Sequence, residues 1–208
     1  MMNNQQEIAT PDIKQKNKVR SQKLAFGTTK WLTYAAALAA LAIIMKFIGQ
    51  FLTLTPSFKI TLIYVIWLIA GAVLGPFGGG AVCFTSDVLG AVIIPMGAIN
   101  PLLILGNVIY GVLAALVFKY TPVRSYTVKF IAAGLMCTLI CTCTLNTAAL
   151  YYWYKWYETL SFWTYFVTYR ALQPAVAAIN IAVTVAMIPL LLRLGLLKPF
   201  KKNIKSEE

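Results

Sequence analysis

Apolar runs long enough to cross a lipid bilayer occupy most of this sequence from Trp31 onward. A helix needs roughly 20 apolar residues to span the hydrocarbon core, so the runs leave room for about six spans and almost no domain outside the membrane. Charged residues make up 12% of the chain, whereas about 25% is ordinary for a soluble domain. The sequence therefore predicts an all-α integral membrane protein with six transmembrane helices and no soluble catalytic unit.

The net charge of +12 comes from basic residues beside the apolar runs, which favours a membrane topology signal over nucleic-acid binding. The residues before the first run, in one middle loop and at the last run are Lys14, Lys16, Lys18, Arg20, Lys23, Lys30, Lys119, Arg124, Lys129, Arg193, Lys198, Lys201, Lys202 and Lys205. The positive-inside rule places them in the cytoplasm, which requires an even number of spans. We expect residues 1–27 and 198–208 to be cytoplasmic tails around a membrane domain of residues 28–197.

The stretch from Gly71 to Gly111 combines a Gly/Pro turn with a lone aspartate in otherwise apolar sequence. Glycine and proline break helices, so the segment GPFGGG should join two spans by a very short connection. Asp87 then falls about two turns into the second of these spans. An ionisable side chain at that depth needs a partner or a cavity, so we expect Asp87 either to hold helices together or to contact a ligand.

Few other polar side chains interrupt the spans. Asn107 and Asn146 lie in mainly aliphatic segments, where they would bond either to neighbouring helices or to a ligand. The basic residues that fall towards the external side are Lys46, Lys59, Lys155 and Arg170. Each of these four raises the question of which anion it meets.

Aromatic residues crowd the segment before the last span, and they include Tyr151, Tyr152, Trp153, Tyr154, Trp156, Tyr157, Phe162, Trp163, Tyr165, Phe166 and Tyr169. Trp and Tyr gather at the headgroup level of membranes, so one interpretation is an interfacial belt. The other is a site for a flat, conjugated, anionic ligand that stacks on some of these rings beside Lys155 and Arg170. Composition alone leaves both interpretations open.

Several kinds of catalytic site are excluded by what the sequence lacks. It contains no histidine, so it has neither a Ser-His-Asp or Cys-His arrangement nor the HExxH metal motif. GPFGGG lacks the Gly-Lys-Ser/Thr ending of a phosphate-binding loop. The cysteines Cys83, Cys137, Cys141 and Cys143 all lie in apolar runs, where we expect buried thiols and no metal site. We therefore expect no enzymatic activity, cofactor or metal.

A set of motifs resembles the substrate-binding S component of energy-coupling factor (ECF) vitamin transporters. They are an alanine-rich first span, GPFGGG after the second span, SDVLG in the third, IYG in the fourth and LNT at 145–147. The similarity extends from about residue 28 to residue 197 and is greatest to the folate-type members. It implies a six-helix protein of the bacterial plasma membrane that binds a vitamin on its outer face. It also implies a membrane coupling subunit and, through it, two cytoplasmic ATPases as partners.

The same resemblance suggests roles for individual basic residues. Basic residues of folate-type members near the end of the first span and the start of the second match Lys46 and Lys59, and an arginine before the last span matches Arg170. We expect these three residues to bind the carboxylates of a folate-like ligand. The aromatic rings expected to stack on it are Tyr152, Trp153 and Trp163. Asn107 or Asn146 would then hydrogen-bond the edge of its ring.

The alanines of the first span form a second candidate surface. Ala35 and Ala39 share a helix face, and small residues at this spacing let another helix approach closely. The resemblance matches them to the family's Ala-x-x-x-Ala contact with the coupling subunit, although they could equally pack against helices of their own chain. The alternatives for the whole protein are an S component for another vitamin or a queuosine-like base, and an autonomous proton-coupled carrier that uses Asp87.

Overall fold

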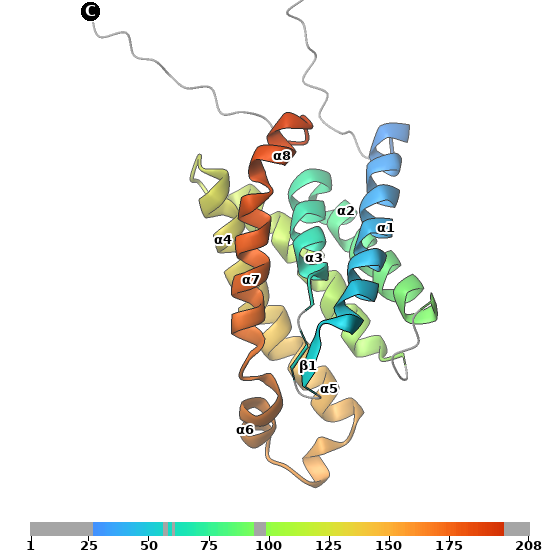
Figure 1. The fold of residues 1–208 in the computed structure, drawn as a ribbon, viewed down its shortest axis with the longest axis vertical. Coiled ribbons are helices and arrows are strands. Elements are labelled where there is room, and N and C mark those ends of the chain that lie inside the picture. The colour runs from blue at the N-terminus through green and yellow to red at the C-terminus, as the bar shows by residue number, and fades with distance from the viewer. Residues whose placement is uncertain (1–26, 56–57, 60, 94–98, 198–208) are drawn as a thin grey trace, which may run out of the picture.

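The computed structural model describes residues 27–55, 58–59, 61–93 and 99–197. These residues form an elongated bundle of helices with one short ribbon of two antiparallel strands near its lower end (Figure 1). The helices of the first half are α1 (Thr29–Phe51), α2 (Ile63–Ile93) and α3 (Pro101–Tyr120). Those of the second half are α4 (Tyr126–Cys137), α5 (Thr147–Trp153), α6 (Phe162–Tyr165), α7 (Gln173–Ala186) and α8 (Ile188–Arg193). The strands are β1 (Thr53–Thr55) and β2 (Phe58–Lys59).

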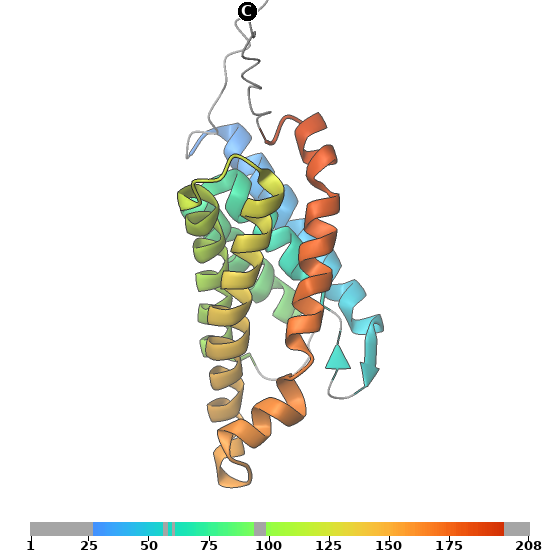
Figure 2. The same ribbon diagram turned by 90° about the vertical axis from the view of Figure 1, so that its left-hand side faces the viewer.

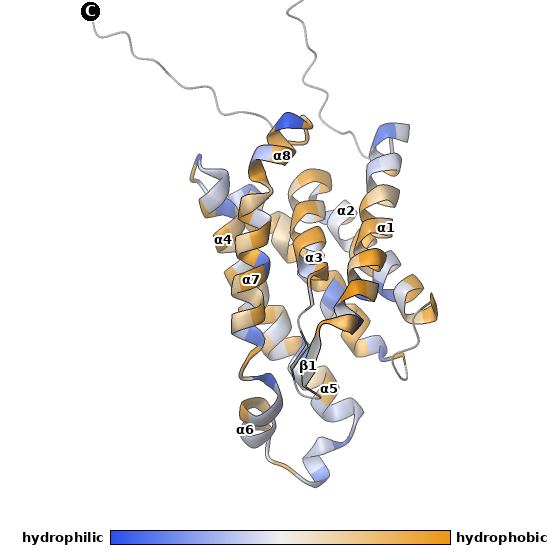
Figure 3. Cartoon of the chain, viewed as in Figure 1, coloured by the Kyte–Doolittle hydropathy of each residue, from blue (hydrophilic) through white to orange (hydrophobic). Residues whose placement is uncertain are grey.

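Five helical stretches among the described residues are long and apolar enough to cross a membrane. They are Thr29–Phe51, Ile63–Ile93, Pro101–Tyr120, Tyr126–Trp153 and Gln173–Arg193. Figure 3 shows the apolar residues along the bundle and paler, more polar residues around α5 and α6. The predicted helical membrane class is confirmed, but the number of separate stretches is five and not six. The difference lies in α2, which contains both the second and the third predicted span.

A sharp reversal at Gly75 divides α2 into two arms, residues 63–74 and 76–93. Gly75 has φ 80° and ψ −174°, a backbone conformation open essentially to glycine alone. Trp67 Nε1 donates a hydrogen bond of 3.0 Å to Ser86 Oγ, 19 residues further along the chain. A straight helix would separate two such residues by about 28 Å. The two arms therefore lie side by side.

The turn is narrower than the sequence predicted, because only Gly75 leaves the helical conformation. Pro76 begins the second arm, at a position where a missing backbone N–H is tolerated. Gly78, Gly79 and Gly80 are helical and buried. A β carbon at Gly79 would lie 2.5 Å from the backbone oxygen of Gly111 in α3. Gly79 and Gly80 therefore serve close packing against α3, and Gly78 serves close packing against Leu74 and Trp31. Helices α2 and α3 share the most extensive helix contact among the described residues.

The long helix of the second half contains a wide-turned segment that the sequence did not predict. Between α4 and α5, residues Thr138–Asn146 form a π-helix, and the whole stretch runs from Tyr126 to Trp153. Threonine hydroxyls reach back five residues within it: Thr144 Oγ1 donates to Leu139 O over 2.9 Å, and Thr147 Oγ1 donates to Thr142 O over 3.0 Å. Such segments are rare and occur often at functional sites.

The two ends of the bundle differ. The start of α1, the end of α8 and the loop between α3 and α4 lie at one end of the bundle (Figures 1 and 2). The ribbon, α5 and α6 lie at the opposite end. Lys30, Lys119, Lys129 and Arg193 belong to the helix ends of the first group. The remainder of the two predicted tails, residues 1–26 and 198–208, lies outside the described residues.

Alanine substitution separates the two uses of glycine in α2. Gly75→Ala should lower the free energy of unfolding by about 1–3 kcal/mol through backbone strain alone, because no atom lies within 4 Å of its would-be β carbon. Gly79→Ala should cost more, since the β carbon would press on backbone atoms that cannot rotate away. The measurement is unfolding in mixed micelles titrated with sodium dodecyl sulfate. A Gly79→Ala protein as stable as the wild type would contradict the close approach of α2 and α3.

Candidate functional site

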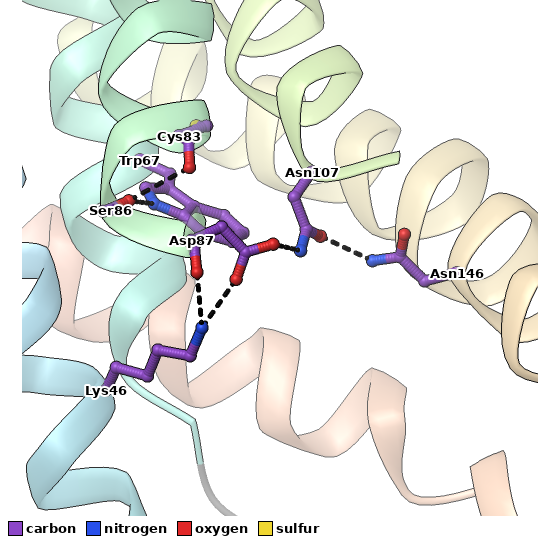
Figure 4. A network of polar contacts seen from close by, with 7 residues as sticks. All are labelled: Lys46, Trp67, Cys83, Ser86, Asp87, Asn107 and Asn146. Atoms are coloured by element: carbon purple, nitrogen blue, oxygen red, sulfur yellow. Dashed lines mark hydrogen bonds and ion pairs between the residues drawn. The ribbon is translucent and has the colours of Figure 1, made fainter. Parts of the chain in front are cut away.

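A chain of buried polar side chains connects four helical segments in the middle of the bundle (Figure 4). Lys46 Nζ of α1 lies 2.7 Å from Asp87 Oδ1 of α2 and also donates to the backbone oxygen of Asp87 over 3.2 Å. Asn107 Nδ2 of α3 donates to Asp87 Oδ2 over 2.8 Å. Asn146 Nδ2 of the π-helix donates to Asn107 Oδ1 over 2.9 Å. We call these four residues the Asp87 network.

Burial makes the Asp87 network a strong constraint on the fold. Asp87, Asn107 and Asn146 are 7%, 5% and 3% exposed. A charge in an apolar interior is costly unless it is paired and hydrogen-bonded, and both carboxylate oxygens of Asp87 have a donor. The geometry therefore gives Asp87 a helix-holding position. It offers no free carboxylate for the proton relay of the carrier alternative.

The charge of Asp87 also sets the orientation of the two asparagines. A carboxylate only accepts hydrogen bonds, so Asn107 must turn its amide nitrogen towards Asp87 and its oxygen towards Asn146. Asn146 must then present its nitrogen to Asn107. The remaining oxygen, Asn146 Oδ1, has no hydrogen-bond partner among the described residues and lies against Gly106. The network thus ends in a buried acceptor.

A second polar cluster surrounds a small cavity between α2, α3, the π-helix and α7. The cavity has a volume of about 10 Å³, and its polar lining consists of Tyr64, Tyr110, Thr138, Thr142, Gln173 and Asn180. The ring of Tyr64 packs on Tyr110 at a centroid distance of 5.1 Å. The Tyr64 hydroxyl also lies near the side chains of Thr142 and Asn146, so the cavity adjoins the Asp87 network. Together they form a polar band inside an apolar bundle.

Three residues of this band had no assigned role from sequence. Tyr64 and Thr142 carry no distinctive sequence signal, because tyrosine and threonine are common in membrane helices. Asn180 could have been found, since an amide in the middle of an apolar span needs a partner. It is 1% exposed, deeper than any site residue that the sequence predicted and whose side chain is described.

The aromatic segment before α7 packs largely on itself. Tyr151 and Tyr165 are buried, their rings lie 5.5 Å apart, and the Tyr151 hydroxyl donates to Leu160 O over 2.8 Å. Arg170 is half-buried at the end of this segment. Burial raises the pKa of the Tyr165 hydroxyl above its ordinary value, and the nearby Arg170 guanidinium opposes part of that rise. The positively charged Arg170 side chain therefore lies beside the aromatic segment, near the start of α7.

The structure brings some of the predicted ligand-binding residues together and leaves others apart. Lys46, Asn107 and Asn146 meet in the Asp87 network. Tyr152, Trp153 and Trp163 lie on the outside of the aromatic segment, with exposed fractions of 61%, 41% and 74%. Tyr152 borders a shallow apolar groove between α3 and α5, away from the polar cavity. Lys59 lies in β2, and its side chain is outside the described part of the structure.

The alanines of α1 face in two directions. Ala39 is 8% exposed and packs in the core, and Ala35 is partly buried against the same core. Ala36 and Ala40, one position further along, are exposed. Packing within the chain accounts for the burial of Ala39. The alanines of α1 that are exposed, and so open to another helix, are Ala36, Ala37 and Ala40.

Removing the charge of Asp87 tests whether the network holds the helices. Asp87→Asn should lower the free energy of unfolding by up to about 3 kcal/mol, because it leaves the ammonium of Lys46, whose side chain is 19% exposed, without a counter-charge. The double variant Lys46→Met, Asp87→Asn should recover part of this loss. The matched control is Glu158→Gln in the pair with Lys155, where the atoms are 4.0 Å apart and the side chains are 57% and 69% exposed. That control should change stability by less than about 1 kcal/mol, and equal effects of Asp87→Asn and Glu158→Gln would refute the holding role.

Comparisons with known proteins identify the family of the chain and a structure with a similar fold. The sequence model of the family described as "ECF transporter, substrate-specific component" matches residues 30–192. Among solved structures, the chain is similar to the crystal structure of FolT bound with folic acid, with a TM-score of 0.59 and 19% identity, over 76% of this chain and 91% of that one. No curated protein matches the sequence. At this identity the structural likeness shows a shared fold, and the family match covers most of the chain.

Proposed function

Because this chain belongs to the family of ECF transporter substrate-specific components, we propose that it captures a folate-like vitamin at the outer face of a bacterial plasma membrane and delivers it to an energised import complex. The observation that carries this proposal is the polar band inside a bundle of a transport family. Hydrocarbon-buried polar residues that converge on a cavity mark substrate sites in membrane proteins. The fold shared with a folic acid-bound protein supports folate as the vitamin.

The membrane topology follows from the reversal in α2. Each arm of α2 crosses once, so the five apolar stretches make six crossings and both chain ends face the cytoplasm. The basic ends of α1, α3, α4 and α8 on one side of the bundle agree with the positive-inside rule. The ribbon, the aromatic segment and the start of α7 then face outward. The vitamin enters from that side.

Arg170 is the residue best placed to bind a carboxylate of the vitamin. Lys46 already has a carboxylate partner 2.7 Å away, so in our proposal it orients the site through Asp87. Arg170 is half-buried beside the aromatic segment and near the polar cavity, and its planar guanidinium can grip a carboxylate with two parallel bonds. Lys59 in β2 assists it. Tyr152, Trp153 and Trp163 stack on the ligand after the aromatic segment closes over it.

Substituting Arg170 tests both the ligand class and the site. Arg170→Ala should weaken folic acid binding by about ten- to a hundredfold, because charge-assisted hydrogen bonds contribute roughly 1.5–3 kcal/mol each. The measurement is isothermal titration calorimetry of the detergent-purified protein. Arg193→Ala, which removes an arginine at the opposite end of the bundle, is the control and should bind as the wild type does. If the wild-type protein binds no folic acid, folate is not its ligand. If Arg170→Ala binds folic acid as tightly as the wild type, Arg170 does not bind the carboxylate.

Transport requires a partner, and we propose that the exposed side of α1 contacts the coupling subunit, which recruits two cytoplasmic ATPases. This helix is the least buried of the five apolar stretches in the described part of the chain. Two of its exposed alanines, Ala36 and Ala40, are four apart and permit close approach of a second helix. Ala35 lies at the edge of the same surface. Ala39 instead packs in the core of the bundle, on the buried side of α1.

Bulky substitutions on α1 should separate binding from transport. Ala36→Trp and Ala40→Trp should leave folic acid affinity unchanged and abolish ATP-dependent uptake into vesicles that contain the complete complex. Ala39→Trp should instead lower stability, because its side chain would enter the core. Leu105→Trp, on an exposed part of α3, is the control for a large ring facing lipid. Full uptake by both Ala36→Trp and Ala40→Trp would place the partner on another surface.

A further inference from the structure

Asn180 is a buried amide without an evident structural need for its oxygen. It lies in α7 between apolar neighbours and is 1% exposed. Its Oδ1 atom has no hydrogen-bond partner among the described residues. Buried polar atoms are almost always paired, so an unpaired one asks for an explanation.

The orientation of this amide is fixed by the groups around its nitrogen. Asn180 Nδ2 donates to Thr61 O over 2.9 Å and to Val176 O over 2.8 Å. A flipped amide would set its oxygen against these two carbonyl oxygens, where no proton could be shared. Oδ1 is therefore held in place as an acceptor, and it cannot turn to find a partner elsewhere.

Asn180 is one of the residues that line the polar cavity between α2, α3, the π-helix and α7. The cavity volume of about 10 Å³ has room for about one water molecule, so a ligand ring could reach Asn180 only if the lining side chains move apart. Thr138, another lining residue, already donates its hydroxyl proton to Gly134 O over 2.7 Å. The other polar lining residues are Tyr64, Tyr110, Thr142 and Gln173, and none of them donates to Asn180 Oδ1. An occupant with a hydrogen-bond donor would satisfy this acceptor.

We propose that Asn180 Oδ1 accepts a hydrogen bond from the N–H edge of the ligand ring and thereby selects rings that present a donor at that edge. This inference rests on the proposed function. The pterin ring of folate carries an amino group and a ring N–H on one edge. A ring with a hydrogen-bond acceptor at the same edge would place its lone pair against a lone pair of Asn180 Oδ1. Neither the ring atom nor Oδ1 could then bond to water instead.

The test compares two ligands on the full-length protein in detergent. Folic acid and its analogue without the 2-amino group are titrated by calorimetry, and the readout is the ratio of their affinities. Wild type should bind the analogue about tenfold more weakly. In Asn180→Leu the two ligands should bind with equal affinity, because the acceptor is gone. The ratio is independent of the fraction of protein that is folded.

Thr184→Ala serves as the matched control in the same helix. The Thr184 hydroxyl is buried and donates to Asn180 O over 2.7 Å, so its loss affects α7 one turn away from the cavity. This control should keep the tenfold preference. If Asn180→Leu does not fold, Asn180→Thr replaces it, since a threonine hydroxyl there can turn back to Val176 O as Thr184 turns to Asn180 O. The expected loss of preference is the same.

Three outcomes would decide against parts of the scheme. An equal preference in wild type and in the Asn180 variant would overturn the role of Asn180 while the proposed function stands. A wild type that binds both ligands equally would overturn it as well. If the wild-type protein binds neither ligand, the proposed function as a folate-binding protein is wrong, and this inference loses its premise.

Discussion

The absence of water inside the bilayer is the constraint from which the rest of this structure follows. A polar group in hydrocarbon must find its partner within the protein, and a charge needs a counter-charge. The Lys46–Asp87 pair, 2.7 Å apart, meets this requirement between α1 and α2, and Asn107 and Asn146 extend it to α3 and the π-helix. One carboxylate thus determines which faces of four helical segments point inward.

Glycine makes this arrangement possible, because the helices must approach closely for short side chains to meet. The packed glycines of α2 and α3 place the two backbones almost in contact at Gly79 and Gly111. Gly90 has a related role, since a β carbon there would lie 2.8 Å from the Lys46 side chain. Backbone packing and electrostatics therefore support each other.

The polarity of the candidate site derives from the same interactions. Asn146 and Asn180 each use their amide nitrogen inside the protein, and each is left with a buried oxygen. For Asn146 the cause is the negative charge of Asp87, and for Asn180 it is a pair of backbone carbonyls. Asn180 borders the polar cavity, whereas the Asn146 oxygen lies against Gly106 of α3. An unpaired acceptor on a lining residue suits a ligand that presents a hydrogen-bond donor. The pterin ring of folate presents such donors.

The sequence by itself determined the membrane class, the helix positions, the reversal near Gly75 and the conspicuous polar residues, because hydropathy and backbone geometry are local properties. It also predicted that Asp87 needs a partner or a cavity. Only the tertiary structure decided that the partner is Lys46, that Gly78, Gly79 and Gly80 pack helices, that Tyr152, Trp153 and Trp163 lie outside, and that Asn180 borders the cavity. These outcomes depend on which helix faces meet, and hydropathy does not distinguish one apolar face from another when lipid and protein interior are equally apolar.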